Sequence, residues 1–357
     1  MAFELDPAIR RIPKAELHVH IEGTVTPEMA RQKAQENNVT LDPAIFSADG
    51  TRFQWKNFFH LVTEVYDNMA RALRTKKDYE DITYDYLTRC AAEGSIYEEL
   101  ICWASQGDAV GLSYKDMVDG MAAGIDRAEK DTGIIARLNS TLVRHQPFDK
   151  VAQEAAMIAS YPHPYIVGLD IAGGESAGDI PKYQPLFDMI FQHFNRPLGM
   201  RLHAREAVGP ENVRDALALT PQPTRIGHGV RSAEDPALMQ KLAADGVMLE
   251  VCPTSNVLAN IYPSYADHPL PVLLAAGVKM CLNSDDPGLF GDSIGEVYQV
   301  SRDQFGLSDT QLLQMTKNAV DGCFAGDAVK AKLHAKIRAY EAGFFKPART
   351  QGPGMAP

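Results

Sequence analysis

Eight short apolar segments, which alternate along the chain with helical patterns and often end in histidine or aspartate, predict a (β/α)8 barrel. The segments are rich in Val, Ile and Leu and are bounded by Gly, Pro, Asn or Asp, as is typical of buried strands. They cover about residues 14–20, 95–102, 134–144, 165–171, 198–204, 224–228, 247–252 and 278–283. Strand and helix signals that alternate in this way indicate parallel βαβ units.

Helical patterns between these strands complete most of the units. They cover about residues 114–132, 148–160, 183–194, 212–219 and 236–245. Eight units within about 270 residues suit a single α/β barrel of the TIM type. We therefore expect one barrel over residues 1–346, followed by a disordered Pro/Gly-rich tail over residues 347–357.

The connection between the first and second strands is unusually long, at about 75 residues. It contains helical patterns at 27–35, 55–72 and 77–92, with a turn-rich stretch at 47–50. We predict a helical insertion after the first strand, over about residues 24–93, which lies over the barrel mouth. Such an insertion would either act as a lid that excludes water or serve only as a packing element.

Charge and composition limit the classes of partner and the compartment. A net charge of −11 argues against nucleic acid or an anionic membrane as a partner, but allows a small neutral substrate. Residues 1–13 contain no apolar segment typical of a signal peptide, and no run approaches the ~18 apolar residues of a membrane helix. Five scattered cysteines without a C-x-x-C pair suggest free thiols in a reducing compartment, so we expect a cytoplasmic protein.

Three histidines and an aspartate at strand ends predict a metal site. His18 and His20 are one residue apart on a strand, so both side chains point to the same face. His203 and Asp285 end two further strands, and in a parallel barrel all of these ends meet at one mouth. Three imidazoles and one carboxylate suit zinc, with a position left for an activated water. The sequence therefore predicts a metal-dependent hydrolase.

Three more polar residues follow strands near this predicted site. Glu206 lies three residues after His203, where a carboxyl group with a raised pKa can donate a proton to a substrate. His228 lies between two glycines, and a histidine beside an activated water can orient it and take its proton. Neighbouring strand residues face opposite ways, so we assign Asp285 to the metal and Asp286 to the substrate.

At this point the chain resembles a known family, the adenosine/adenine deaminases of the amidohydrolase superfamily. The resemblance lies in short segments that occur in family order: residues 13–23 (PKAELHVHIEG), 168–173 (GLDIAG), 226–229 (IGHG), 252–256 (CPTSN) and 284–287 (SDDP). It implies a barrel with one zinc ion that releases ammonia from a 6-aminopurine by hydrolysis. In this resemblance His18, His20, His203 and Asp285 would hold the zinc, with His20 also beside the substrate.

The resemblance also implies roles around the purine. Glu206 would protonate N1, and His228 would orient and help deprotonate the attacking water. Asp286 would hydrogen-bond N7, and the backbone at Gly173 would meet N3. The residue at the position of Glu22 contacts the sugar in the adenosine enzymes.

Two departures from the family pattern bear on activity and substrate. Arg205 stands where the family usually has glycine, between His203 and Glu206, so its cation either points into solvent or depresses the Glu206 pKa. Glu22 stands where the adenosine enzymes usually carry aspartate and adenine-specific relatives more often carry glutamate. The segments at Gly173 and His228 look more like the adenosine type.

We therefore predict a zinc-dependent deaminase of adenosine and 2′-deoxyadenosine in purine salvage. The alternative is an adenine deaminase, or a deaminase of another 6-aminopurine, with the same chemistry. Two other classes are a catalytically inactive barrel that binds nucleosides and a two-metal amidohydrolase that acts on an amide or phosphotriester. The first usually loses a ligand or the acid, and the second usually needs a bridging Lys or Glu where this chain offers Asp170.

Overall fold

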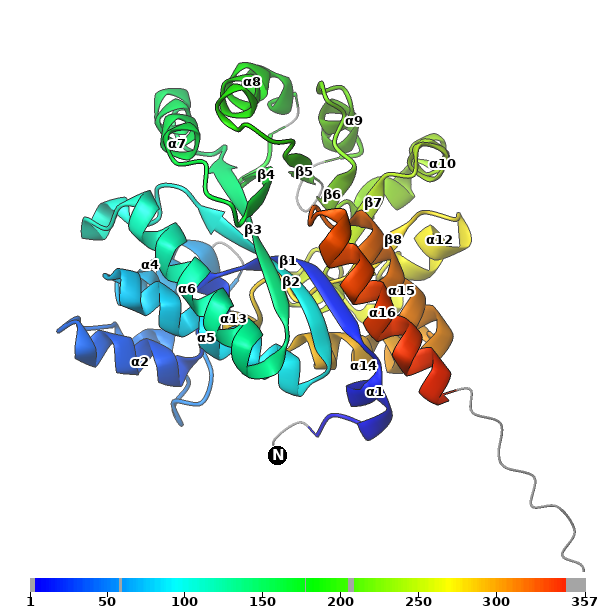
Figure 1. The fold of residues 1–357 in the computed structure, drawn as a ribbon, viewed down its shortest axis with the longest axis horizontal. Coiled ribbons are helices and arrows are strands. Elements are labelled where there is room, and N and C mark those ends of the chain that lie inside the picture. The colour runs from blue at the N-terminus through cyan, green and yellow to red at the C-terminus, as the bar shows by residue number, and fades with distance from the viewer. Residues whose placement is uncertain (1–3, 58–59, 177, 205–208, 345–357) are drawn as a thin grey trace, which may run out of the picture.

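Eight parallel strands form a nearly closed barrel, and helices surround it (Figure 1). This computed structural model describes residues 4–57, 60–176, 178–204 and 209–344. The strands follow one another in chain order: β1 (Lys14–His20), β2 (Ser95–Trp103), β3 (Ile135–Val143), β4 (Ile166–Ala172), β5 (Gly199–Ala204), β6 (Arg225–His228), β7 (Met248–Val251) and β8 (Met280–Leu282). The predicted (β/α)8 TIM barrel is confirmed, and each predicted strand lies within two residues of the observed one.

The barrel closes between the first and last strands through residues just past β8. Val19 forms an isolated parallel bridge with Asp285, and the N–H of His20 donates to the Asp285 carbonyl at 2.9 Å. The N–H of Asp285 in turn donates to the His18 carbonyl at 3.2 Å. Barrel closure therefore uses the residues that the sequence places at the metal site.

The outer helices occupy the connections between strands. They are α6 (Tyr114–Thr132), α7 (Phe148–Ser160), α8 (Gln184–His193), α9 (Glu211–Leu217), α10 (Pro236–Asp245), α11 (Pro253–Leu258) and α12 (Leu270–Ala275). Helices α1 (Pro7–Arg11), α13 (Pro287–Phe290), α14 (Ile294–Phe305), α15 (Asp309–Gly322) and α16 (Asp327–Phe344) lie at the two ends of the chain. Short helical turns are η2 (Pro43–Ile45), η4 (Asp108–Val110), η5 (Ile180–Tyr183), η6 (Val230–Glu234) and η7 (Tyr265–Asp267).

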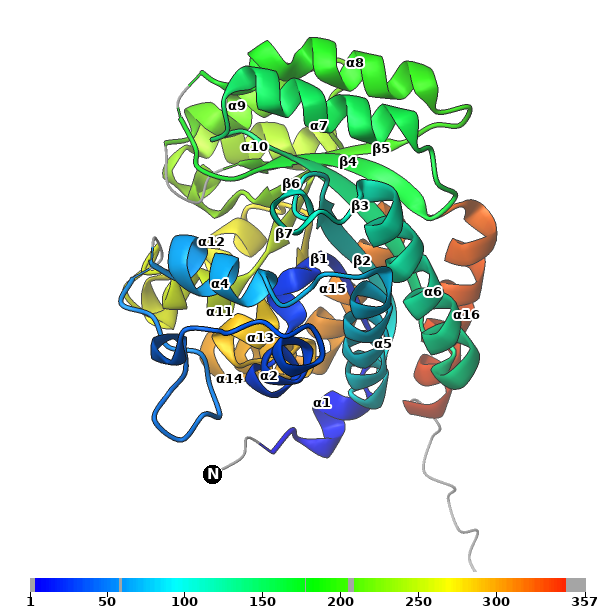
Figure 2. The same cartoon turned by 90° about the vertical axis from the view of Figure 1, so that its left-hand side faces the viewer.

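The segment between β1 and β2 carries several helices of its own. After η1 (Glu22–Thr24) come α2 (Pro27–Glu36), the π-helix η3 (Leu61–Tyr66), α4 (Asp67–Ala70) and α5 (Lys76–Ala92). In Figure 2 the blue helices α2 and α4 lie on the side that faces the viewer, in front of the strands. Lys33 of α2 forms ion pairs with Asp78 and Asp81 of α5, which in turn packs against α6.

Local signals explain why the helices begin and end where they do. Helix α6 begins after Ser113, whose hydroxyl accepts from the N–H of Asp116, and ends at Gly133 with φ +76°. Helix α10 begins after Asp235, which accepts from the N–H groups of Ala237 and Leu238. Among the described residues, no helix is long and apolar enough to cross a membrane. The predicted tail at 347–357 lies outside the described residues.

Candidate active site

The structure brings together four histidines and one aspartate at the carboxyl ends of the strands. His18 and His20 come from β1, His203 from β5, His228 from β6, and Asp285 follows β8. The Nε2 atoms of His20 and His203 are 3.2 Å apart, and the Asp285 Oδ1 lies 3.4 Å from Nε2 of both His18 and His20. His228 is slightly farther away, with Nε2 3.9 Å from the Asp285 Oδ2.

The donor atoms of this cluster fit one divalent ion. Zinc bound at about 2.0–2.1 Å to nitrogen in a tetrahedral site places its ligand atoms about 3.3 Å from one another. The observed separations of 3.2–3.4 Å among His18, His20, His203 and Asp285 agree with that value. The Nε2 atom of His18 is buried and has no hydrogen-bond partner, as a nitrogen kept for a metal would be.

Two buried carboxylates orient the histidine rings. The Asp170 Oδ2 lies 2.8 Å from Nδ1 of His203, and the Glu250 Oε2 lies 3.2 Å from Nδ1 of His18. A neutral imidazole donates its N–H to the carboxylate that it faces, so Nδ1 of His203 carries hydrogen and its Nε2 presents a lone pair to the cluster. Nδ1 of His18 also lies 2.9 Å from a guanidinium nitrogen of Arg201, which holds this ring as well.

The backbone is strained at two residues of the cluster. His228 has φ +57° and Asp285 has φ +69°, in the left-handed region that residues with a side chain rarely adopt. They are two of four such non-glycine residues in the described ranges. Ser255 donates to the Asp285 Oδ2 at 2.6 Å and holds this carboxylate in place. Strain that is concentrated in this way is typical of functional sites.

Burial keeps three histidines of the cluster neutral. It lowers the pKa of His20 and of His228 to about 4, although the nearby Asp285 carboxylate acts in the opposite direction. Burial also lowers the pKa of His203 well below its ordinary range. The pKa of His18 is instead raised against the effect of burial by its contacts with Asp285 and Glu250.

Asp286 lies on the turn that follows β8, directly before α13. Gly23, in the turn after β1, packs against this carboxylate so closely that a Cβ at position 23 would overlap the Asp286 Oδ1. Only glycine therefore fits at position 23. Asp286 and the η1 turn form one side of the mouth, next to the histidine cluster.

Gly173 directly follows β4 and has φ +88°. A Cβ at this position would overlap the His145 ring, so the backbone runs close to that side chain. The carbonyl of Gly173 accepts from Nε of Arg144 at 3.1 Å. Arg144 also donates to the carbonyl of His203 at 3.1 Å and pairs with Glu175 at 2.9 Å, and so ties the ends of β4 and β5 together. Sequence reasoning missed this arginine.

Glu22 begins the η1 turn, two residues after His20, and is 1% exposed. The hydroxyl of Tyr66 donates to its Oε2 at 2.9 Å, and the hydroxyl of Tyr79 donates to its Oε1 at 2.9 Å. Both tyrosines come from the segment between β1 and β2. Sequence reasoning did not identify them, because neither lies at the end of a strand.

The predicted acid Glu206 and its neighbour Arg205 lie outside the described residues. The last described residue before them is Ala204, which ends β5 directly after His203. The role of Glu206 therefore stays a prediction.

A buried ionic network lies beneath the cluster, inside the barrel. Arg201 of β5 pairs with Asp170 at 2.7 Å and with Glu250 of β7. Glu250 also pairs with Arg225 of β6 at 2.9 Å, and Arg225 pairs with Glu99 of β2 at 2.7 Å. All five side chains are fully buried. The neighbouring arginines lower the pKa values of Asp170 and Glu250 against the effect of burial, so both carboxylates stay charged beneath the histidines.

Cys252 lies within ligand distance of His18, His228 and Asp285. Burial raises the pKa of its thiol well above the ordinary range, and its sulfur lies 3.6 Å from the carbonyl of Glu250, to which it donates. A neutral thiol is a poor metal ligand. These features favour a packing role for this cysteine.

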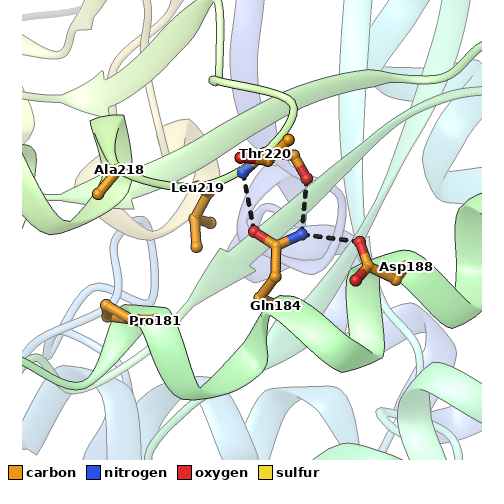
Figure 3. Close-up of a pocket in the computed structure, with 6 residues that line it drawn as sticks. All are labelled: Pro181, Gln184, Asp188, Ala218, Leu219 and Thr220. Atoms are coloured by element: carbon orange, nitrogen blue, oxygen red, sulfur yellow. Dashed lines mark hydrogen bonds between the residues drawn. The ribbon is translucent and has the colours of Figure 1, made fainter.

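Two pockets lie away from the cluster. One, of about 400 Å³, lies between α8 and the chain after α9 (Figure 3). There Gln184 donates to the carbonyl of Thr220 at 2.6 Å and to Asp188 at 2.7 Å, and it accepts from the N–H of Thr220 at 2.8 Å. The other, of about 340 Å³, is lined by residues of the loops after β2 and β3 and by Asp67 of α4. Neither pocket is lined by a predicted site residue.

The family assignment follows from a comparison with known proteins. A family model described as adenosine deaminase matches residues 13–340. The chain belongs to the adenosine deaminase family. Together with the relatives described next, this membership makes it a hydrolytic deaminase that acts on a carbon–nitrogen bond.

Relatives within this adenosine deaminase family are named for a different substrate. The adenine deaminase of Agrobacterium fabrum is 38% identical over 91% of this chain and 97% of its own length. The adenine deaminase of Rhizobium meliloti is also 38% identical, over 91% of this chain and 98% of its own length.

Solved structures agree with the fold. An adenine deaminase from Arthrobacter aurescens superposes with a TM-score of 0.82 at 29% identity, over 92% of this chain and 99% of its own. An amidohydrolase from Burkholderia ambifaria, solved with bound zinc, superposes with a TM-score of 0.81 at 24% identity. This superposition covers 96% of this chain and 95% of the amidohydrolase chain.

These findings correct the predicted substrate. Adenosine and 2′-deoxyadenosine were favoured by the motifs at Gly173 and His228, and this prediction is wrong. Relatives at 36–38% identity over most of the chain are adenine deaminases, and so is the superposed Arthrobacter aurescens enzyme. Both motifs are expected around the purine ring, which adenine and adenosine share, so they do not separate the two substrates. Glu22 was the residue that pointed to adenine.

Proposed function

We propose that this chain is an adenine deaminase that converts adenine and water to hypoxanthine and ammonia. The observation that carries the proposal is the 38% identity to adenine deaminases over 91% of the chain. Glu22 supports it, because adenine-specific relatives more often carry glutamate at this position, where the adenosine enzymes usually carry aspartate. The five buried free cysteines support a cytoplasmic location for the enzyme.

We further propose that His18, His20, His203 and Asp285 hold one zinc ion. Three imidazole nitrogens and one carboxylate oxygen are a typical donor set for zinc, which tolerates such a mixture in a compact site. An ion bound there would supply a nucleophile at neutral pH by lowering the pKa of a water molecule.

The surrounding residues would transfer protons and bind the purine. His228, kept neutral by burial, would act as the base for the attacking water. Glu206 would donate a proton to N1 of the ring. Asp286 would hydrogen-bond N7, and the backbone of Gly173 would meet N3. The purine would then lie across the mouth between β4 and β8, with C6 toward the histidines.

The test is an absorbance assay of the purified, zinc-loaded enzyme with adenine, adenosine and 2′-deoxyadenosine in parallel. We expect turnover of adenine, with far lower kcat/KM for both nucleosides. Turnover of the nucleosides at a rate comparable with adenine, or of none of the three, would contradict the proposal.

The variant Glu206→Gln tests the acid in the same assay. It should keep stoichiometric zinc and lose roughly 10² or more in kcat, since proton transfer by a positioned acid contributes about that much. Near-normal turnover of adenine by this variant would remove Glu206 from the mechanism. His18→Ala is the companion variant and should lose the zinc itself.

A further inference from the structure

The carboxylate of Glu22 is held at both of its oxygens. Tyr66 donates to Oε2 and Tyr79 to Oε1, each at 2.9 Å, and the glutamate is 1% exposed. Two hydroxyl donors, one on each oxygen, fix the plane of the carboxylate as well as its position. The side chain therefore cannot turn toward another partner unless a tyrosine contact breaks.

The two tyrosines come from separate elements with different surroundings. Tyr79 lies in the first turns of α5, 1% exposed, and packs where α5 meets α6 at Gly120. Tyr66 ends the π-helix η3, a form with wide turns that is rare and often occurs at functional sites. Both elements belong to the segment between β1 and β2, so this segment contributes directly to the mouth.

Asp286 shows where Glu22, Tyr66 and Tyr79 lie relative to the proposed purine site. Gly23, next to Glu22, packs against the Asp286 carboxylate. The hydroxyl of Tyr66 lies close enough to Glu22 and Asp286 that both charges add to the effect of burial in raising its pKa. Glu22 thus lies beside the carboxylate that we assign to N7. In a purine, N9 belongs to the same five-membered ring as N7, and we place N9 toward Glu22.

We propose that Tyr66 and Tyr79 are positioning residues that make the enzyme select free purine bases over 9-substituted purines. They act through Glu22, whose oxygens each keep a lone pair that can accept a hydrogen bond from N9–H of a free base. A 9-substituted purine has no such hydrogen and meets the fixed carboxylate with a carbon group. This inference rests on the proposed function and explains which residues enforce its substrate class.

A buried polar group that is left without a partner can separate two substrates by about 10⁴–10⁵. We therefore expect the wild-type enzyme to prefer adenine to 9-methyladenine strongly in kcat/KM. Removal of both hydroxyls in Tyr66→Phe/Tyr79→Phe frees the Glu22 side chain to turn away. The ratio of kcat/KM for adenine to that for 9-methyladenine should then fall at least about tenfold.

The experiment measures this ratio for the zinc-loaded wild type, both single variants and the double variant. Tyr298→Phe is the matched control, because it removes a buried hydroxyl that bonds Thr316 at 2.9 Å and does not contact Glu22. Its ratio should equal that of the wild type. A merely structural role for Tyr66 and Tyr79 would lower turnover of both substrates together and leave the ratio unchanged.

An unchanged ratio in the double variant, with adenine still turned over by the wild type, overturns this inference alone. A wild type that does not deaminate adenine overturns the proposed function and this inference with it. If the double variant does not fold, Glu22→Gln keeps the side-chain shape but removes the symmetric acceptor, and the ratio must fall there too. An unchanged ratio in Glu22→Gln would also overturn the inference.

Discussion

Asp170 illustrates how much a single buried carboxylate determines at this site. It faces Nδ1 of His203 at 2.8 Å and accepts from the backbone N–H of the same residue at 3.2 Å. Arg201 holds it from the other side at 2.7 Å. A histidine whose distal nitrogen donates to a carboxylate is a stronger and better-oriented metal ligand. We therefore expect Asp170 to affect metal affinity without itself being a ligand.

The variant Asp170→Asn tests this role. The amide has the same shape but no charge, so we expect zinc affinity to fall about 10–100-fold. Competition with a chromophoric chelator measures it. Asp245→Asn, at an exposed ion pair with Lys241, is the matched control and should bind zinc as the wild type does. Equal zinc affinity in the Asp170 variant would exclude the orienting role.

The position of a residue on its strand decided whether it could be predicted from the sequence. His18, His203 and Asp285 stand at strand ends, where a polar side chain after an apolar run is conspicuous. Arg201 and Glu250 lie inside their strands and were missed. Yet Arg201 precedes His203 by two positions, and a period of two places both on the inward face. A charged residue two positions before a predicted ligand could therefore have indicated Arg201.

At the scale of elements, helices with clear capping residues were predicted closely. The predicted bounds of α6, α7 and α10 match the observed ones. Ser113 and Gly133 mark the two ends of α6, and Asp235 marks the start of α10. The predicted helix at 55–72 differs, since the structure has the π-helix η3 followed by the short α4. Tyr66, the last residue of η3, contacts the distant Glu22, and no local pattern reveals this contact.

The turn after β4 provides a prediction at this scale. Gly173→Ala places a methyl group in the left-handed region and against the His145 ring, so it should raise the KM for adenine and destabilise the turn. Gly246→Ala is the matched control, because Gly246 has φ +68° but open space around it. Urea unfolding and steady-state kinetics separate the two effects.

The control should lose only about 1 kcal/mol of unfolding free energy, from backbone strain, and keep its KM. If Gly173→Ala behaves like the control in both measurements, the close approach of the chain at His145 has no part in binding.

At the scale of the whole molecule, the barrel interior is held by ions as well as by apolar side chains. Glu99 accepts hydrogen bonds from four donors: Arg225 at 2.7 Å, Tyr97 at 2.8 Å, Asn139 at 3.0 Å and the N–H of Phe324 at 2.7 Å. These partners come from β6, β2, β3 and the chain before α16. One carboxylate therefore ties the amino-terminal end of the barrel together.

Glu99→Gln should destabilise the protein strongly. An amide presents a donor where the site needs acceptors, and it removes one of the two carboxylates that pair with Arg225, the other being Glu250. Breaking a buried ion pair costs about 3–5 kcal/mol. Denaturant unfolding measures the loss. Glu234→Gln, at the exposed pair with Arg231, should change the unfolding free energy by less than about 1 kcal/mol. Equal stability of the two variants would refute this view of the interior.

The order of eight parallel strands was predictable from alternating patterns alone. A closed barrel was predicted as well, but the bridge between Val19 and Asp285 was not, because it joins residues far apart in the sequence. The ionic network could not be predicted from the sequence either, because its members come from different strands and pair only once the barrel has formed.

That bridge also has a consequence for how the enzyme is made. His18 and His20 leave the ribosome early, but Asp285 follows His18 by 267 residues. At a synthesis rate of about 5–20 residues per second, the first ligands wait roughly 15–50 s for the last one. The nascent chain therefore carries an incomplete set of the proposed ligands until Asp285 emerges, so we expect the metal to bind only late in translation.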